Sequence, residues 1–260
     1  MGGYTVWPGG SGRTESSADA PWRRWADAPR RAAAAALSGG CQTVPVTTFD
    51  CADPVARRAG LEAAGRQTAS GELVVLPTDT VYGIGADAFN SAAVQKLLAT
   101  KGRGPDMPVP VLVGSWSTLD GLVTASTPTM RRLIEAFWPG GLSLVVEHAP
   151  SLQWNLGDTQ GTVMVRMPLH PVALDLLRAV GPMAVSSANR SGRAPAVTAA
   201  EAEEQLLDDV SVYLDGGPCQ LGVASTVVDL TGDFPRVLRQ GAVELDRIRD
   251  VVGEVVAADD

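Results

Sequence analysis

Short apolar segments rich in β-branched residues alternate along this chain with segments that carry helix-start signals, and this alternation restricts the fold. The expected strands are residues 73–76, 109–113, 142–146, 162–167, 183–186, 226–230 and 236–238, with a further strand around Tyr213. Capping residues and early prolines predict helices over residues 53–67, 90–101, 127–138, 171–180, 198–207 and 245–252. Such an order is typical of an α/β fold with a sheet of mixed strand directions.

Local signals refine this prediction at three places. Pro110 lies within the expected strand 109–113, and it would confine that strand to a sheet edge or a bulge. Residues 78–85 follow the strand 73–76 as a polar loop. Thr198 and Glu201 have the spacing of a capping box, which predicts that a helix begins there.

The first 43 residues differ in composition from the rest of the 260-residue chain, because glycines, serines and an alanine run at 32–36 replace any periodic pattern. We expect a disordered N-terminal extension over residues 1–43 and one folded domain over residues 44–260. Trp22 and Trp25, with neighbouring arginines, could instead form a short amphipathic helix that docks on another surface. No apolar stripe extends beyond these two residues, so the disordered extension is favoured.

Charge and cysteine content exclude several classes of protein. The 21 basic and 29 acidic residues give a net charge of -8, so a nucleotide or nucleic-acid site has to be a local basic patch. The cysteines, Cys41, Cys51 and Cys219, lack the spacing of a zinc cluster or a disulfide framework, which fits a reducing, cytoplasmic location. No stretch approaches the roughly 20 apolar residues that cross a bilayer, so no membrane partner is expected.

Polar residues that directly follow the expected strands are the candidate ligands, because open α/β sheets bind ligands where strands end. Thr80 lies in the loop 78–85, which equally suits an ordinary turn. The loop 186–192 is rich in hydroxyl and amide groups, and an Asx turn is the competing interpretation. Ser225 and Arg239 flank the late strands. Each of these signals is modest when it is taken alone.

Three cations stand where an anion could bind. Lys101 and Arg103 flank Gly102 after a helix, an arrangement that suits a phosphate group and also the negative end of the helix dipole. The pattern is not a P-loop, since no G-x-x-x-x-G-K-[ST] sequence occurs. Arg166 shares a strand face with Met164, and an arginine within an apolar strand needs an anionic partner, such as a substrate carboxylate, or an exit to solvent.

Familiar catalytic groups are missing from the sequence. His148 and His170 lie at element boundaries, and no G-x-S-x-G elbow supports a serine triad. Two distant histidines and three scattered cysteines do not form a metal site, so any metal is expected to be Mg²⁺ that arrives with phosphate groups.

The order of the polar segments along the chain resembles the YrdC-like family, whose members are threonylcarbamoyl-adenylate synthases. The matching segments are 77–83 (PTDTVYG), 101–103 (KGR), 138–144 (WPGGLSL), 165–168 (VRMP), 187–189 (SAN), 225–229 (STVVD) and 238–242 (LRQGA). The resemblance covers residues 44–252. It implies a twisted open α/β domain with flanking helices and a large central cavity, here a single-domain form with an added N-terminal extension.

The resemblance also implies a reaction and a set of site residues. L-Threonine, bicarbonate and ATP would yield threonylcarbamoyl-AMP and pyrophosphate, and the product would pass to the machinery that transfers the threonylcarbamoyl group to tRNA. The implied threonine subsite consists of Thr80, Arg166, Ser187 and Ser225. The implied ATP contacts are Lys101, Arg103, Thr162, Asn189, Thr198 and Arg239. Lys101, Arg103 and Mg²⁺ would neutralise the charge that grows on the phosphate oxygens during the displacement.

Departures from the family pattern keep alternatives open. Met107 replaces an ATP-contacting asparagine, and Leu112 or Val113 stands where a histidine would meet threonine. The altered stretch 104–113 leaves open a YciO-like paralogue with weak or changed synthase activity. A double-stranded RNA-binding module is the other alternative, which the net charge of -8 disfavours. No general base for carbamate formation is identified beyond Asp79 as a candidate.

Overall fold

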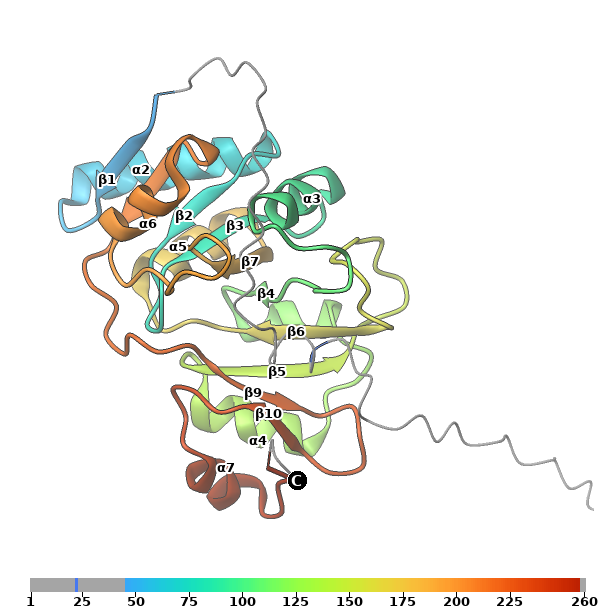
Figure 1. Cartoon of the computed structure of the whole chain (residues 1–260). Coiled ribbons are helices and arrows are strands. Elements are labelled where there is room, and N and C mark those ends of the chain that lie inside the picture. The colour runs from blue at the N-terminus through green and yellow to red at the C-terminus, as the bar shows by residue number, and fades with distance from the viewer. Residues whose placement is uncertain (1–21, 23–44, 258–260) are drawn as a thin grey trace, which may run out of the picture.

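The computed structural model describes Trp22 and residues 45–257, and its central feature is one mixed β-sheet (Figure 1). The strands are β1 (Thr47–Asp50), β2 (Val74–Leu76), β3 (Gly83–Asp87), β4 (Val111–Leu112), β5 (Leu142–Glu147), β6 (Thr162–Arg166), β7 (Met183–Ser187), β8 (Val212–Asp215), β9 (Thr226–Asp229) and β10 (Arg236–Arg239). Their order across the sheet is β1-β8-β2-β3-β7-β4-β6-β5-β9-β10. The predicted α/β class with flanking helices is confirmed.

The helices begin where the sequence predicts them. They are α2 (Pro54–Ala69), α3 (Ser91–Thr100), α4 (Pro128–Phe137), α5 (Pro171–Val180), α6 (Ala199–Leu206) and α7 (Leu245–Val252), with 3₁₀ turns η2 (Trp116–Gly121) and η3 (Leu207–Asp209). The Asp53 carboxylate caps α2 by accepting a hydrogen bond from the Ala56 amide at 2.7 Å. The Thr127 hydroxyl caps α4 in the same way, with the Met130 amide at 3.1 Å.

The sheet contains both parallel and antiparallel pairings, and helices cover both of its faces. The β2–β3, β3–β7, β4–β7 and β5–β6 pairs are antiparallel, whereas the β4–β6 and β5–β9 pairs are parallel. Helices α2 and α5 pack against β2, β7 and β8 in one apolar cluster. Helices α3, α4 and α7 contribute to the larger cluster, and α4 and α7 lie beside the β5–β9–β10 end of the sheet (Figure 1).

Two strands differ from the sequence predictions for identifiable reasons. The loop predicted over residues 78–85 ends early, because β3 begins at Gly83, where a Cβ would lie 2.6 Å from Val185 Cγ1. Glycine therefore marks a close approach of two strands here and not a flexible turn. The edge position suggested by Pro110 is wrong, since β4 lies between β7 and β6. Pro110 directly precedes the two-residue strand β4, and its carbonyl accepts a hydrogen bond from the Val185 amide at 2.9 Å. Strand β1 and turn η2 had no sequence signal that we recognised.

The predicted disordered extension over residues 1–43 lies outside the described residues except for Trp22, and the domain boundary at residue 44 stays a prediction. The Trp22 side chain is buried against Val145, Met164, Val227 and Leu238. Within residues 45–257, none of the helices combines the length and apolar character that a membrane crossing requires.

Candidate active site

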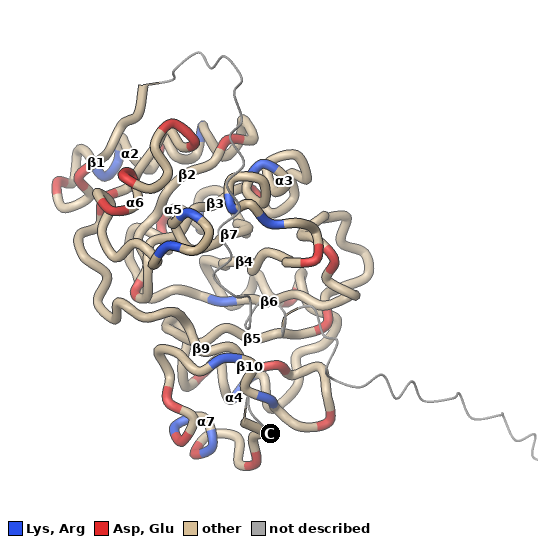
Figure 2. The backbone as a smooth tube through the Cα atoms, viewed as in Figure 1, with Lys and Arg blue, Asp and Glu red and all other residues tan. Residues whose placement is uncertain are grey.

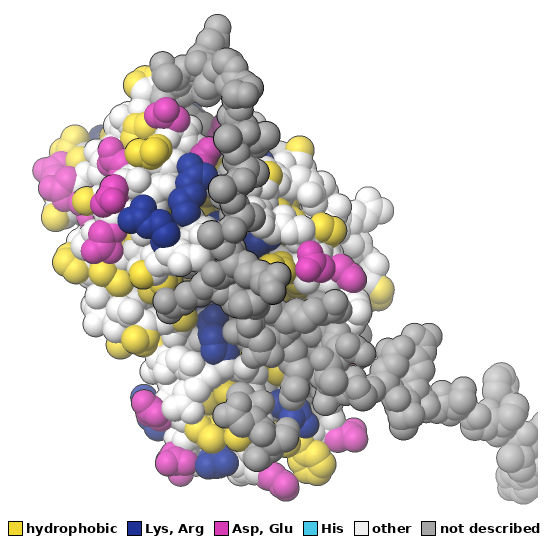
Figure 3. Space-filling view, viewed as in Figure 1, with side chains coloured by type: hydrophobic (Ala, Val, Ile, Leu, Met, Phe, Trp, Pro, Cys, Tyr) yellow, Lys and Arg dark blue, Asp and Glu magenta, His cyan; other side chains and the backbone are white. Residues whose placement is uncertain are grey.

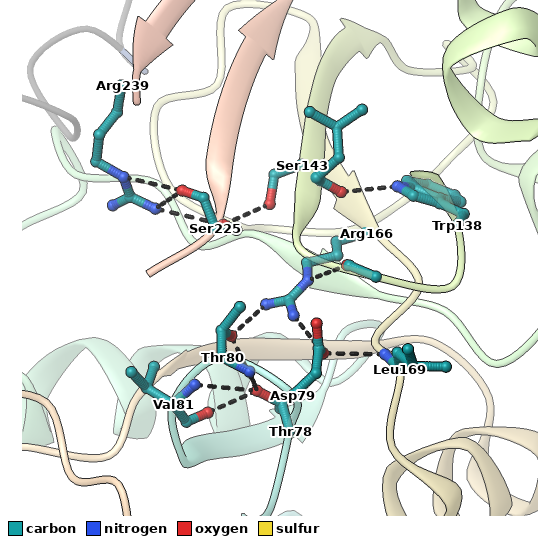
Figure 4. A network of polar contacts seen from close by, with 12 residues as sticks. Thr78, Asp79, Thr80, Val81, Trp138, Ser143, Arg166, Leu169, Ser225 and Arg239 are labelled. Atoms are coloured by element: carbon teal, nitrogen blue, oxygen red, sulfur yellow. Dashed lines mark hydrogen bonds and ion pairs between the residues drawn. The ribbon is translucent and has the colours of Figure 1, made fainter. Parts of the chain in front are cut away.

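Side chains from the middle of the sheet and from the adjoining loops surround a cavity of about 160 Å³. The predicted site residues that line it are Thr80, Arg103, Arg166, Ser187, Ser225 and Arg239. They come from six separate segments of the chain, and Figure 4 shows four of them, Thr80, Arg166, Ser225 and Arg239, in one polar network. The sequence therefore identified a group of residues that the fold does bring together.

Strand alternation explains why one face of the sheet carries these groups. Successive side chains of a strand point to opposite faces, so Met164 and Arg166 of β6 share a face. Ser143 on β5 and Ser225, directly before β9, lie on the same side, and their hydroxyl oxygens are 2.9 Å apart. The intervening apolar residues, such as Leu144 and Val165, point into the core below.

Arg166 is the centre of the polar network. Its Nε donates to the Gly140 carbonyl at 2.8 Å, its Nη1 to Thr80 Oγ1 at 2.8 Å, and its Nη2 to Asp79 Oδ1 at 2.5 Å. Asp79 is thus an anionic partner of Arg166 within the protein, as the position of an arginine in an apolar strand predicts. Asp79 Oδ1 also accepts a hydrogen bond from the Leu169 amide at 2.9 Å. Three of the five guanidinium N–H groups are used, which leaves donors for a substrate.

The loop after β2 holds Thr80 in place through Thr78. The Thr78 hydroxyl donates to the Val81 carbonyl at 2.7 Å and accepts from the Thr80 amide at 3.1 Å. Its oxygen also lies 3.0 Å from Thr80 Oγ1. Thr78 therefore forms the turn that the sequence suggested as one interpretation, while Thr80 presents its hydroxyl to Arg166 and to the cavity.

Arg239 reaches the opposite wall of the cavity. Its Nε and Nη2 donate to the Ser225 carbonyl at 3.2 and 2.8 Å, and Nη2 lies 3.3 Å from Ser225 Oγ (Figure 4). Gly241 permits this arrangement, because a Cβ there would lie 2.2 Å from the Ala224 carbonyl oxygen. The pKa of Arg239 is lowered to about 10 by burial, and then by the positive charges of Arg166 and Arg103.

The cavity is electropositive. Burial lowers the pKa of Arg103, and it lowers that of Arg166 against the opposing effect of Asp79. Among the described residues, the buried Nη1 of Arg103 has no hydrogen-bond partner. A buried, unpaired guanidinium donor beside two further arginines is costly unless an anion binds there. The geometry therefore favours an anionic ligand with oxygen acceptors, such as a carboxylate or a phosphate.

Lys101 and Asn189 do not line the cavity. The Lys101 ammonium group donates to the carbonyls of Ser187 and Asn189 and to Asn189 Oδ1, so its three N–H groups bind the end of β7 and the loop that follows it. The Asn189 amide in turn donates to the Arg190 and Arg193 carbonyls at 3.0 and 2.7 Å. Burial, followed by repulsion from Arg103 and Arg190, lowers the pKa of Lys101 to about 7. These two residues therefore brace the end of β7, where Ser187 lies, and the loop that follows it.

Thr162 and Thr198 also lie outside the cavity lining. The Thr162 hydroxyl accepts a hydrogen bond from Trp22 Nε1 at 2.8 Å and donates to the Thr159 carbonyl at 2.7 Å. Thr198 caps α6 by accepting from the Glu201 amide at 3.2 Å, as the capping-box spacing predicts. The Glu201 carboxylate, however, accepts from the amide of Val197 and not from that of Thr198.

Several lining residues received no role from the sequence. Ser143 interrupts the apolar residues 142–146 of β5, and this polar interruption is the same signal that identified Arg166. Leu112, one of the two candidates for the position of the histidine in the family pattern, lines the cavity and makes its wall apolar at that point. Met107, expected from the family pattern to stand in place of an asparagine, is not among the lining residues.

A mixed sheet whose central segments direct arginines and hydroxyls into one cavity defines an α/β protein with a site that suits small anions. Residues 66–241 match the family model Sua5_yciO_yrdC, which is described as telomere recombination. Because this match spans more than half of the chain, the protein belongs to the Sua5/YciO/YrdC family.

Relatives of known name support this assignment. A Mycobacterium tuberculosis (strain ATCC 25618 / H37Rv) protein, provisionally named threonylcarbamoyl-AMP synthase, is 64% identical over 206 residues, which cover 79% of this chain and 95% of the relative. The threonylcarbamoyl-AMP synthase of Bacillus subtilis (strain 168) is 40% identical over 71% of this chain and 54% of the relative. The crystal structure of Pyrococcus abyssi Sua5 complexed with L-threonine has a TM-score of 0.76 at 33% identity, covering 83% of this chain and 62% of that one.

Proposed function

We propose that this protein is an L-threonylcarbamoyladenylate synthase, which converts L-threonine, bicarbonate and ATP into threonylcarbamoyl-AMP and pyrophosphate. The observation that carries the proposal is the convergence of Arg103, Arg166 and Arg239 on one cavity with the hydroxyls of Thr80 and Ser225. One substrate carries a carboxylate and another a triphosphate, and guanidinium groups bind both kinds of oxygen acceptor. The family membership and the names of the relatives point to the same reaction.

The reaction needs positioned charge more than it needs a side-chain nucleophile. The threonine amine forms a bond to the carbon of bicarbonate with loss of water, and this gives a carbamate. A carbamate oxygen then attacks the α-phosphorus of ATP, and the bond between that phosphorus and pyrophosphate breaks. Negative charge accumulates on the phosphate oxygens during this displacement, and buried arginines stabilise it because their surroundings have a low dielectric constant.

The residues fall into two groups by what they would touch. Arg166 and Thr80 would hold the threonine carboxylate, with Ser187 and Ser225 completing that subsite. Arg103 and Arg239 would bind the phosphates, and the unpartnered Nη1 of Arg103 supports this role.

The remaining site residues would act through their neighbours. Lys101 and Asn189 would be positioning residues, since their polar atoms bind the end of β7, where Ser187 lies, and the loop that follows it. Asp79, the candidate general base, is engaged with Arg166, so its geometry suits orientation of that guanidinium group.

Magnesium would enter with the nucleotide. The donors that line the cavity are guanidinium and hydroxyl groups, which bind anions. Within residues 45–257, no cluster of three or more His, Cys, Asp or Glu side chains is available to hold a metal. This donor set fits an ion that the triphosphate coordinates and brings with it, where it would neutralise phosphate charge. The product would then pass to the enzymes that transfer the threonylcarbamoyl group to tRNA, in the cytoplasm.

A pyrophosphate-release assay tests the proposal. The purified protein with ATP and Mg²⁺ is expected to release pyrophosphate only when both L-threonine and bicarbonate are added. Omission of either substrate, or replacement of L-threonine by L-valine, is expected to abolish the signal or reduce it strongly. Pyrophosphate release that does not depend on threonine would contradict the proposed function.

The RNA-binding alternative receives no support from the surface charge. Of the cations that could form a patch, Lys101 is buried, Arg190 pairs with Asp209 at 2.6 Å, and Arg193 lies 3.5 Å from Glu204. On the face that Figure 3 shows, the visible basic side chains of the described residues lie in separate groups near acidic ones, and Figure 2 shows the positions of these residues along the backbone. The pyrophosphate-release assay also distinguishes an active synthase from a YciO-like paralogue with weak activity, since the paralogue would bind the substrates but release pyrophosphate slowly.

A further inference from the structure

Trp22 is buried on the same face of the sheet as the cavity, although it lies far from the other site residues in the sequence. Its side chain is 1% exposed and packs against Val145, Met164, Val227 and Leu238. Its Nε1 donates to the Thr162 hydroxyl at 2.8 Å. Both the apolar rings and the polar N–H group of the indole therefore have partners, which defines a specific docking position.

The Trp22 position continues directly from the cavity. Met164 lines the cavity and also contacts the Trp22 cluster. Thr162, Met164 and Arg166 are every second residue of β6, so their side chains point to the same face of the sheet. Ser143 and Val145 of β5 are related in the same way. One face of β5, β6 and β9 thus has a polar half at the arginines and an apolar half that the indole covers.

The size of the cavity indicates what the indole displaces. The cavity holds about 160 Å³, whereas pockets for larger ligands enclose roughly 300–1,000 Å³. The space beside the arginines suits an amino acid or phosphate groups, but a complete nucleotide needs room for its base. The apolar half of the face would supply that room if Trp22 left, with a hydroxyl at its end for a ring nitrogen or an amino group.

We propose that Trp22 is an internal competitor of ATP, whose indole occupies the position that the adenine base takes in the complex. The indole is a planar bicyclic ring with an N–H donor, so it makes the stacking contacts and the Thr162 hydrogen bond that a purine with an amino group would make. This inference rests on the proposed function, because that function supplies the nucleotide. ATP binds only after the indole has left. The apparent ATP affinity is therefore the intrinsic affinity multiplied by the fraction of molecules in which Trp22 is undocked.

Equilibrium binding of ATP to full-length variants tests the proposal. With Mg²⁺ present and threonine absent, Trp22→Ala is expected to bind ATP about tenfold more tightly than the wild type by isothermal titration calorimetry, a difference of about 1.4 kcal/mol. Trp22→Phe retains the apolar contacts but loses the N–H donor, so an intermediate affinity is expected. The affinity for L-threonine is expected to stay unchanged in both variants.

Two controls accompany these variants. Trp116→Ala alters an indole that is 45% exposed in η2, away from the cavity, and its ATP affinity is expected to match that of the wild type. Thermal unfolding of each variant shows whether it is folded. If Trp22→Ala fails to fold, Trp22→Phe still decides the question. Addition of ATP to the wild type is also expected to shift tryptophan emission to longer wavelength, and this shift is expected to be absent from Trp22→Ala.

The outcomes separate this inference from the proposed function. Equal ATP affinity in the wild type and Trp22→Ala, or weaker binding by the variant, would overturn the competition even if the synthase reaction occurs. Weaker binding would mean that the indole is a wall of the nucleotide site. If pyrophosphate release did not depend on threonine but Trp22→Ala bound ATP more tightly, the proposed function would fail while the competition held.

Discussion

The buried ion pair between Arg166 and Asp79 makes a quantitative prediction about stability. The two side chains are 7% and 2% exposed, and Nη2 lies 2.5 Å from Oδ1. Removal of one partner leaves the other charge buried without compensation, which costs about 3–5 kcal/mol in proteins. We therefore expect Asp79→Asn and Arg166→Gln each to lower the free energy of unfolding by about that amount. A loss of 3 kcal/mol corresponds to a fall in Tm of roughly 6–12 °C for a domain of this size.

A double-mutant cycle isolates the interaction from the individual losses. In the double variant neither charge remains, so its destabilisation is expected to be smaller than the sum of the single effects by at least about 2 kcal/mol. Urea unfolding followed by circular dichroism provides the four free energies. Arg57 and Asp175 form a matched control pair with the same 2.5 Å separation but side chains that are 30% and 42% exposed. Their coupling is expected to be below about 1 kcal/mol. Single effects at Asp79 and Arg166 that simply add would refute the argument that burial makes this pair interdependent.

Three further predictions concern the neighbouring groups. Arg103→Ala is expected to reduce the rate of pyrophosphate release by about 10²–10³. Its Tm is expected to stay within a few degrees of the wild type, because Nη1 of Arg103 has no protein partner to lose. Full activity of this variant would contradict the phosphate role of Arg103. The pKa of Lys101 is lowered to about 7, so between pH 7 and its ordinary value of 10.5 the unfolded chain binds the extra proton, and stability rises with pH across that window. Urea unfolding at pH 7 and pH 10 is expected to show this rise in the free energy of unfolding for the wild type and not for Lys101→Met. The same pH dependence in both proteins would contradict the assignment of this rise to Lys101. Gly241→Ala would place a Cβ 2.2 Å from the Ala224 carbonyl oxygen. Weaker ATP binding and a lower Tm are therefore expected for this variant. An unchanged ATP affinity would show that the segment near Arg239 shifts to accommodate the added methyl group.

The helices and most strands could be predicted because their signals are local. Asp53 and Thr127 cap helices through contacts within three residues, so no tertiary information is needed. Strand β3 was missed because its glycines are selected by close packing against Val185, a residue about a hundred positions away in the sequence. The position of β4 inside the sheet was equally hidden, since Pro110 precedes the paired residues and does not interrupt them.

The candidate site could be predicted as a set of residues but not as a set of contacts. An arginine in an apolar strand, such as Arg166, predicts an anionic partner. The partner itself could not be predicted, because Asp79 is 87 positions away in the sequence. Lys101 and Arg103 look equivalent in the sequence, but a turn at Gly102 lies between them. Lys101 therefore binds the end of β7, whereas Arg103 lines the cavity. The docking of Trp22 had no periodic signal, since no apolar stripe extends beyond Trp22 and Trp25 in the sequence.

A crystal structure of the protein with L-threonine and ATP bound together tests the central claim most directly, which is that one cavity holds a carboxylate and a triphosphate side by side. The threonine carboxylate is expected within hydrogen-bond distance of Arg166 and Thr80, and the phosphates are expected on Arg103 and Arg239. Ligand density at any other surface, with these four side chains unengaged, would contradict the account.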